Sequence, residues 1–390
     1  MRLRWFISST VRQAADMRKH VQELLNSQRD ILSSQALSAL ETSLKEMQAA
    51  LDADADAPAL QKQMEALEKT ATKWIKPYPY ADWRDNVEVF LVAIVVAMGI
   101  RTFFLQPFKI PTGSMQPTLF GVQTVDLRSD PGFHMPGILT RAYEVAVHGT
   151  IYHQIIAPQD GELVQVSRVD HSLHLVNRQT LFVRYGGSDK EVPLTLWAGP
   201  EDDQKNQFDA GLTRLYSFHK GDPIVCFKET TGDHLFVDRF TYNFRPPHRG
   251  EIIVFMTKGI AGIRDQDQFY IKRLIGLGGE TVSIGEDRHV RIDGRRLDAS
   301  TPHFENVYGF DPRSEPQDSH YSGHVLDGRS NLGTPGQSIT VPPGHFVVFG
   351  DNTVNSLDSR YWGPLPEENV IGKSFFVYWP ITSRFGWGQQ

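Results

Sequence analysis

Residues 107–119 hold the first side chain in this sequence that could do covalent chemistry. The backbone around Ser114 is stiffened on both sides while its hydroxyl keeps little steric cover, through Pro111, Gly113 and Pro117. A nucleophilic serine needs fixed geometry, an exposed oxygen and a nearby N–H group for the oxyanion. Taken alone, a Gly-Ser-Met turn is more often an ordinary loop. The interpretation therefore depends on finding a base.

Lys272 is the candidate base. The sequence has no HExxH motif, and Ser114 lies in neither a G-x-S-x-G nor an S-x-x-K motif. Lys272 and Arg273 are neighbours in an apolar, strand-like segment, so one of the two must point toward an apolar layer. A lysine held there loses solvation, its pKa falls, and the neutral amine can take a proton. The alternative is an edge strand on which both cations reach solvent.

A third segment, residues 349–363, follows a strand-like run and gathers carboxylate, amide, hydroxyl and guanidinium groups in one loop. We expect Asp351, Asp358 and Arg360 to be structural, as partners in ion pairs and turns. Ser356 differs, because its hydroxyl could orient another side chain.

Helical segments precede these residues. Apolar residues step by three and four, as on one face of a helix, at Leu37, Leu40, Leu44, Met47 and Leu51, and after a break again at Leu60, Met64 and Leu67. We predict a helical hairpin or coiled-coil-like region over residues 1–80, on the cytoplasmic side.

A short apolar run follows, and it predicts one transmembrane helix over residues 86–106, although a buried core helix would show the same pattern. Aromatic residues on its entering side would form an interfacial belt, namely Trp74, Tyr78, Tyr80 and Trp83. Basic residues on that side favour a cytoplasmic N-terminus, against Arg101 and Lys109 on the other side.

From about residue 107 onward the pattern is β, with short β-branched and aromatic runs between Gly, Pro and Asp clusters. We predict a mainly β fold, with one domain formed by residues 107–121 and 232–382. Asp293-Gly294 predicts a hairpin turn. Residues 122–231 form a β-rich insertion, in which residues 155–166 resemble one hairpin of a small barrel.

Composition narrows the class of protein. The 390 residues are 40% hydrophobic and carry a net charge of −6, which argues against a disordered polymer, a polytopic membrane protein and a broad nucleic-acid binder. Cys226 is the only cysteine, so no intramolecular disulfide and no thiolate zinc site can form. The histidine pairs His148/His153 and His171/His174 are more typical of surface or packing positions than of a metal site. We therefore expect no metal and no cofactor.

Together, the segments around Ser114, residues 249–255, residues 270–280 and residues 350–360 resemble the type I signal peptidases, which are membrane-anchored Ser–Lys endopeptidases. The order of the segments and the anchor ahead of them match, and the resemblance covers about residues 85–120 and 231–380. It implies a signal-peptidase-type β catalytic domain on the extracytoplasmic face of the inner membrane. The expected partners are exported preproteins with signal peptides, membrane lipid and the secretion machinery, and not nucleic acid.

The resemblance also implies roles for individual residues. Ser114 would be the nucleophile, Lys272 the general base, and Ser356 the residue that orients the lysine amine. The Ser114 N–H and the Thr112 hydroxyl would form the oxyanion hole, and here threonine stands where many relatives have serine. Pockets admitting small residues at −1 and −3 would be lined by Ile110, Pro111, Met115, Leu119, Tyr270 and Ile271. Glu251, where aspartate is usual, is expected to be structural.

Two alternatives stay open at this point. One is a Ser–Lys autoprotease of the SOS-repressor type, which would need a DNA-reading helical domain and a self-cleavage site. The other is a non-catalytic, membrane-anchored β protein that uses the insertion for binding.

Overall fold

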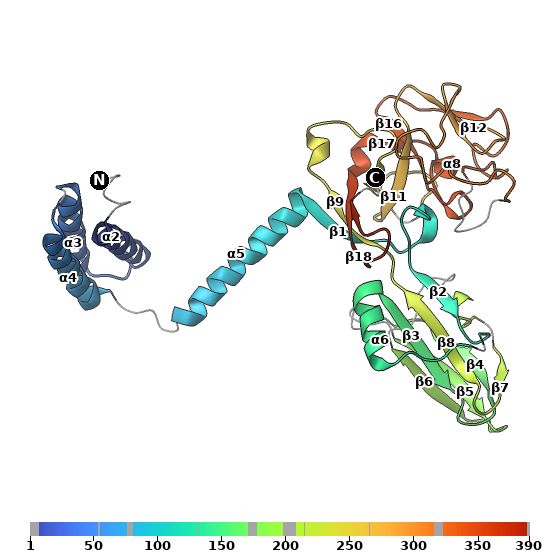
Figure 1. Ribbon diagram of the computed structural model, residues 1–390, viewed down its shortest axis with the longest axis horizontal. Coiled ribbons are helices and arrows are strands. Elements are labelled where there is room, and N and C mark those ends of the chain that lie inside the picture. The colour runs from blue at the N-terminus through green and yellow to red at the C-terminus, as the bar shows by residue number, and fades with distance from the viewer. Residues whose placement is uncertain are drawn as a thin grey trace. The chain divides into compact units, whose positions relative to one another are not determined.

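The computed structural model describes residues 8–53, 55–75, 81–130, 132–170, 178–197, 208–213, 215–264, 266–315 and 323–387. The chain divides into two compact units, Met1–Val95 and Val96–Gln390, and the division falls inside helix α5 (Figure 1).

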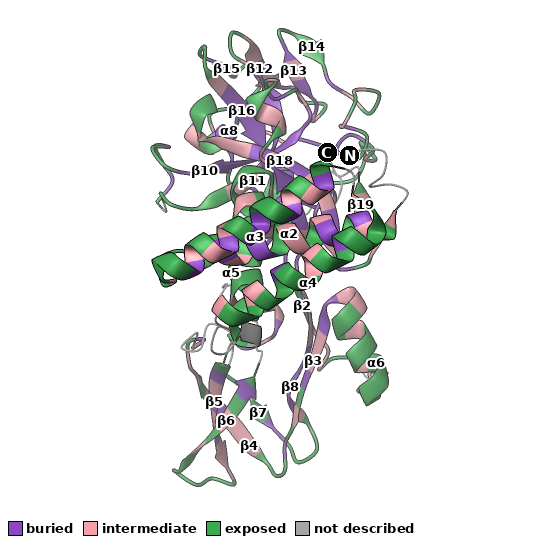
Figure 2. Cartoon of the chain, turned by 90° about the vertical axis from the view of Figure 1, so that its left-hand side faces the viewer, coloured by how far each residue is buried: buried purple, intermediate pink, exposed green. Residues whose placement is uncertain are grey.

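Three helices pack on one another in the first unit: α2 (Ser9–Ser27), α3 (Ser34–Asp52) and α4 (Ala57–Trp74). Each helix follows a capping residue whose side chain accepts a hydrogen bond from a backbone N–H of the first turn, and these caps are Ser8, Ser33 and Asp56. Figure 2 shows their buried residues as patches on otherwise exposed helices. The expected hairpin comprised only α3 and α4. Helix α2 completes the core with Val11, Ala14, Val21 and Leu25, because a two-helix hairpin leaves one side of its apolar seam uncovered.

Helix α5 (Ala81–Phe103) contains a 21-residue stretch, Trp83–Phe103, with a mean hydropathy of 1.8 and none of its window buried. Its length and composition suffice to cross a membrane. The helix ends at Phe103 rather than at residue 106, because Leu105 already opens strand β1 (Leu105–Lys109). Pro107, within that strand, could not have continued a helix without losing a hydrogen bond.

The second unit is built around an eight-stranded antiparallel sheet in the order β1-β9-β18-β10-β11-β16-β17, with β19 beside β18. In Figure 2 its central strands are largely buried. The further strands are β9 (His234–Asp238), β10 (Ile252–Met256), β11 (Phe269–Gly276), β16 (His345–Phe349), β17 (Leu365–Pro366), β18 (Val370–Trp379) and β19 (Gly386–Trp387). Two apolar clusters cover its faces, one around Ile110 and Val254 and the other around Ile253 and Leu274.

A smaller sheet extends from this one in the order β14-β13-β12-β15, and its strands are β12 (Thr281–Ile284), β13 (Val290–Ile292), β14 (Arg295–Arg296) and β15 (Ser338–Thr340). Asp293 and Gly294 both have positive φ, of 49° and 81°, between β13 and β14. That geometry is the hairpin turn predicted for this dipeptide. Short helical turns complete the unit: η1 (Gly113–Met115), η3 (Thr241–Asn243), η4 (Thr353–Asn355), α8 (Ser359–Trp362) and η5 (Glu367–Asn369).

The segment between Gly121 and Gly232 forms two further sheets, β2-β8-β3 and β6-β5-β4-β7, around a shared apolar core. Its elements are β2 (Gln123–Asp126), α6 (Ile138–Tyr143), η2 (Glu144–His148), β3 (Thr150–Ile156), β4 (Gly161–Val166), β5 (Arg178–Tyr185), β6 (Glu191–Trp197), β7 (Ser217–Phe218) and β8 (Pro223–Thr230).

The hairpin expected over residues 155–166 is wrong, because β3 and β4 belong to different sheets. Between them, Ala157 exchanges backbone hydrogen bonds with Gly221 and Asp222. The chain therefore crosses from one sheet to the other at the point where the sequence pattern suggested a turn.

Candidate active site

Ser114 lies in the turn η1, directly after strand β1, and only 7% of it is exposed. The loop after β16 holds this turn from the other side. Asn352 donates its backbone N–H to the carbonyl of Ser114 (3.0 Å) and its side-chain amide to the carbonyl of Gly113 (3.1 Å). These bonds fix the peptide units on both sides of the serine.

Gly350 allows this close approach. A Cβ atom at that position would lie 2.5 Å from the carbonyl oxygen of Ser114 and 2.2 Å from Oγ of Ser356. Both distances are shorter than real Cβ contacts allow. A glycine is therefore required for the serine turn and the loop to pack together.

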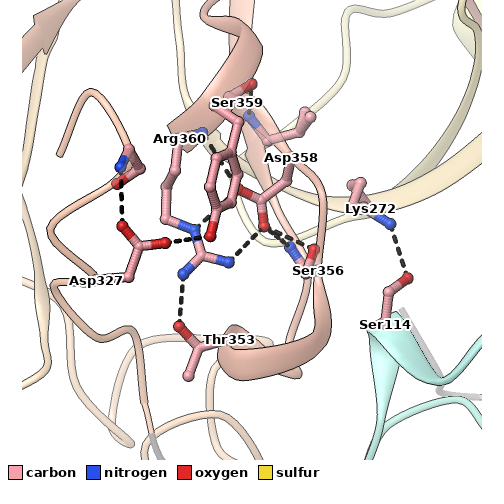
Figure 3. Close-up of polar contacts among 12 residues, drawn as sticks. Ser114, Lys272, Asp327, Thr353, Ser356, Asp358, Ser359 and Arg360 are labelled. Atoms are coloured by element: carbon pink, nitrogen blue, oxygen red, sulfur yellow. Dashed lines mark hydrogen bonds and ion pairs between the residues drawn. The ribbon is translucent and has the colours of Figure 1, made fainter. Parts of the chain in front are cut away.

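Lys272 reaches the serine from strand β11. Its Nζ donates a hydrogen bond of 2.7 Å to Oγ of Ser114 (Figure 3). It donates a second one, of 3.0 Å, to the carbonyl of Ile271. Only 4% of Lys272 is exposed. The strand alternation left open whether Lys272 or Arg273 points inward, and the structure buries both of them on opposite faces of the sheet.

Burial lowers the pKa of Lys272 to about 8, while the charges of Asp358 and Asp351 oppose this shift and Arg360 adds to it. The usual value is 10.5. An amine with a pKa near 8 exists in part as the neutral base at neutral pH. The contact and the electrostatics therefore suit the removal of the serine proton.

An ion pair lies behind the lysine, between Asp358 and Arg360 (Figure 3). Arg360 donates from Nε to Oδ1 (2.9 Å) and from Nη2 to Oδ2 (2.8 Å), and neither residue is exposed. Burial would raise the pKa of Asp358, but the charge and hydrogen bonds of Arg360 hold it below its usual value. Asp358 therefore stays ionised, and its charge raises the pKa of Lys272 while that of Arg360 lowers it.

Ser356 was expected to orient the lysine amine. In the structure its hydroxyl donates to Oδ2 of Asp358 at 2.7 Å (Figure 3). The hydrogen bonds of Lys272 within the described residues go to Ser114 and Ile271. A direct role for Ser356 on the lysine stays a prediction.

Thr112 lies next to the candidate nucleophile, and its role as an oxyanion-hole donor stays a prediction. Its Oγ1 lies 3.5 Å from Oγ of Ser114, and the residue precedes η1 in extended backbone. Gly121 packs directly on the backbone of Thr112, where an added Cβ would lie 2.2 Å from the Thr112 carbonyl carbon. Gly121, the residue before the insertion, thus packs against the segment that carries the candidate donor.

A cavity of about 400 Å³ opens at Ser114 and Lys272. Three of the six predicted pocket residues line it, namely Pro111, Tyr270 and Ile271. The other three do not, because Ile110, Met115 and Leu119 are at most 2% exposed and form part of the apolar cluster of the sheet. Their side chains are part of the core and not of the cavity lining. Asn355 and Leu357 line it instead, from the loop that also holds Ser356.

Arg273 and Asp351 form a second buried ion pair that the sequence did not reveal. Asp351 accepts from Nε (2.8 Å) and Nη2 (2.7 Å) of Arg273 and from the hydroxyl of Thr118 (2.5 Å). Asp351 was expected to pair within its own loop, and instead it ties that loop to β11 and to the segment after Ser114. The partners lie 78 and 233 positions away. No local pattern identifies contacts at such separations.

Glu251 has a structural environment. It accepts hydrogen bonds from Arg245 (2.5 Å) and from the backbone N–H of His248 (2.8 Å), and it lies 3.3 Å from Lys373. Burial opposes ionisation, but these donors lower the pKa of Glu251 to about 2. It lies outside the cavity lining around Ser114.

In the described residues, no three His, Cys, Asp or Glu side chains come close enough to hold a metal ion. His148 pairs with Glu144 (3.0 Å), and the His153 ring packs 4.6 Å from Phe227. His171 and His174 lie outside the residues that the structure describes.

The similarity of this chain to known proteins falls on the segments that form this site. The family described as "Signal peptidase, peptidase S26" matches residues 83–130 and 228–379, just over half of the chain. Signal peptidase I of Leptolyngbya laminosa is 33% identical over 154 residues, covering 38% of this chain and 62% of that protein. Probable signal peptidase I-1 of Synechocystis sp. is 35% identical over 160 residues, covering 40% of this chain and 66% of that protein.

The chain thus spans less than two thirds of the length of either relative. The crystal structure of a signal peptidase I from Enterococcus faecalis is 29% identical, with a TM-score of 0.22, and the match covers 33% of this chain and 97% of that chain. The family match leaves out the three-helix unit and residues 131–227.

Proposed function

The chain belongs to the signal peptidase family, peptidase S26, and we propose that it is a membrane-anchored serine endopeptidase that removes signal peptides from exported preproteins. The observation that carries the proposal is the 2.7 Å contact between Nζ of a buried lysine and Oγ of Ser114 at the mouth of a cavity. Neither the autoprotease nor the non-catalytic alternative is favoured, since the family match includes both Ser114 and Lys272.

The proposed reaction begins with proton transfer from Ser114 to the neutral amine of Lys272, while Oγ attacks the scissile carbonyl carbon. The resulting oxyanion accepts hydrogen bonds from the backbone N–H of Ser114 and the hydroxyl of Thr112. As the C–N bond breaks, the lysine ammonium gives its proton to the leaving amine. The product of this half is an ester between Ser114 and the signal peptide.

The second half repeats the chemistry with water. The neutral amine of Lys272 takes a proton from a water molecule, whose oxygen attacks the ester carbonyl. Collapse of the tetrahedral intermediate returns the proton to Oγ of Ser114 and releases the signal peptide. No residue outside the Ser114, Lys272 and Thr112 group is needed for proton movement in this scheme.

Small residues at −1 and −3 of the substrate are part of the proposal. The cavity walls are formed by the ring of Pro111 and by Tyr270 and Ile271. Its volume of about 400 Å³ has to serve both side chains and the backbone between them. Such space favours small side chains over aromatic ones.

The proposed substrate explains why this enzyme would be anchored in a membrane. We propose that α5 crosses the inner membrane once, with the three-helix unit in the cytoplasm and the β unit on the extracytoplasmic side. A preprotein held by its hydrophobic signal segment then presents its cleavage region to a site fixed near the same surface. The secretion machinery is a further proposed partner.

The test is processing of a preprotein with an Ala-x-Ala site by the detergent-solubilised protein. We expect the Ser114→Ala and Lys272→Ala variants to lose processing by a factor of about 10³ or more. Ser338→Ala and Lys220→Ala, which change exposed residues elsewhere, serve as matched controls and should retain it. Equal processing by the wild type and both site variants would refute the proposed chemistry.

A further inference from the structure

A second cavity, of about 780 Å³, lies where helix α5 ends against the β unit. Thr102 and Phe103 of α5 form one side, and Arg239, Lys258 and Glu368 lie among the residues of the other sides. It shares no lining residue with the cavity at Ser114. The peptidase mechanism uses none of its side chains.

The cavity presents two cations. Nη1 of Arg239 donates to Oε1 of Gln106 at 2.9 Å, and among the described residues this is the one side-chain hydrogen bond of its five guanidinium donors. Within the described part of the chain, neither Arg239 nor Lys258 has an acidic partner. Glu368 is the only carboxylate of the lining, so the cavity carries a formal charge of +1.

Aromatic side chains next to Arg239 indicate where this cavity would lie relative to a membrane. The carbonyl of Phe104 accepts the backbone N–H of Arg239 at 2.9 Å, and the Phe104 ring stacks on Phe240 with centroids 5.3 Å apart. Phe240 packs on Phe244 at 4.7 Å, and all three rings are exposed. Exposed aromatic rings at the end of an apolar helix are typical of the membrane–water interface. With α5 placed across the membrane as proposed above, Arg239 would lie at the depth of the lipid headgroups.

We propose that this cavity binds the phosphate group of a membrane phospholipid between Arg239 and Lys258. Basic pockets beside membrane helices suit lipid headgroups, because cations there meet phosphate oxygens at reduced dielectric. A phosphodiester carries one negative charge and matches the net charge of the cavity. Free phosphate carries more charge near pH 7 and is repelled by Glu368. The acyl chains would extend along α5, past Phe103.

This inference rests on the proposed membrane placement of α5 and not on the peptidase chemistry. The Ser114→Ala variant should therefore bind lipid as the wild type does. Absence of processing by the wild type, or equal processing by the wild type and Ser114→Ala, would count against the proposed reaction and would leave this site standing if lipid binding is intact.

The experiment is a titration of the delipidated full chain in detergent with dioleoyl phosphatidylglycerol, with bound lipid counted by native mass spectrometry. The wild type should retain one lipid in a saturable way. Arg239→Gln/Lys258→Gln should bind about tenfold more weakly or worse, because two charge-assisted contacts are lost. Lys190→Gln/Lys220→Gln removes the same charge from exposed positions of the insertion and should bind as the wild type does.

Two further measurements make the result decisive. Lys258→Gln alone keeps the Arg239–Gln106 hydrogen bond and should still weaken lipid binding, which separates the charge from local folding. Inorganic phosphate at the same concentration should displace little lipid, and Glu368→Gln should make it a better competitor. The proposal is overturned if the double variant binds lipid as tightly as the wild type, or if inorganic phosphate competes as an equal.

Discussion

Nζ of Lys272 lies 2.7 Å from Oγ of Ser114, although 158 positions separate the two residues in the sequence. Strand β11 carries the lysine, whereas the serine sits in a turn after β1, four strands away along the sheet order. The turn is brought to β11 by the loop after β16, through Asn352 and Gly350.

The pH dependence of processing should report the lysine. With a pKa of about 8, Lys272 is mostly protonated below that pH and mostly neutral above it. We expect kcat/KM to rise about tenfold per pH unit below pH 8 and to level off above it. Steady-state rates between pH 6 and 10, on a substrate without titratable groups near the cleavage site, measure this profile. A rate independent of pH between 6 and 8 would contradict a lysine base.

Thr112 is predicted to stabilise the oxyanion. Thr112→Val keeps the volume and removes the hydroxyl, so kcat should fall by about 10² to 10³ while KM changes little. Thr112→Ser restores the hydroxyl and should recover most of the rate. Equal rates for the valine and serine variants would show that the 3.5 Å neighbour of Ser114 is only a packing residue.

The sequence predicted the chemistry better than the architecture of the site. The local patterns around Ser114 and Lys272 were each ambiguous, and the two residues became identifiable only because the four segments together, in their order, resemble one family. The Arg273–Asp351 ion pair and the hydrogen bond from Asn352 to Gly113 could not be predicted, because these contacts form only when distant strands have paired. The sequence also did not show that Ile110, Met115 and Leu119 are buried in the core and so do not line the cavity.

The same distinction holds for the fold. The Asp293-Gly294 turn was predictable because positive φ at both positions is a local property. Strand crossing between the two sheets of the insertion was not, because Ala157 bonds to residues more than sixty positions later. Helix α2 was missed because its stripe includes small and polar residues that only the packing of α3 and α4 turns into a core.

Burial of Lys272 should cost stability in a pH-dependent way. The folded pKa of about 8 lies below the usual 10.5, so the penalty is complete below pH 8 and is lost as the pH rises to 10.5. That difference corresponds to roughly 3 kcal/mol, of which the lost bond to Ser114 offsets about 1. Lys272→Met should therefore be more stable than the wild type at pH 7 by about 2 kcal/mol.

Denaturant unfolding at pH 7 and pH 10.5 measures this effect, because the advantage of the methionine variant should disappear at the higher pH. Lys190→Met changes an exposed lysine and should show no such trend. An advantage that stays constant across this range would mean that Lys272 is not strained by its burial.

Arg384 is predicted to stabilise the place where the insertion, residues 122–231, joins the rest of the β unit. Its Nε and Nη2 donate to the fully buried Asp233 at 2.8 and 2.9 Å, and Asp233 also accepts the backbone N–H of Phe120. Arg384→Gln leaves that carboxylate without its cation, which should lower the free energy of unfolding by about 3 kcal/mol. Arg295→Gln, at an exposed position, is the control. A loss below about 0.5 kcal/mol, the range of surface substitutions, would exclude this role.

Gly350→Ala should push the serine turn and the loop after β16 apart. The new Cβ would meet Oγ of Ser356 at 2.2 Å and the carbonyl of Ser114 at 2.5 Å, so the loop or the serine turn must move. A displacement on the order of 1 Å at a reacting group costs about a hundredfold in rate, and we expect a loss of that size in kcat. Gly137→Ala, where nothing lies within 4 Å, is the matched control and should process normally. Wild-type kcat in the Gly350→Ala variant would show that the reaction does not depend on this close packing between Ser114 and the loop.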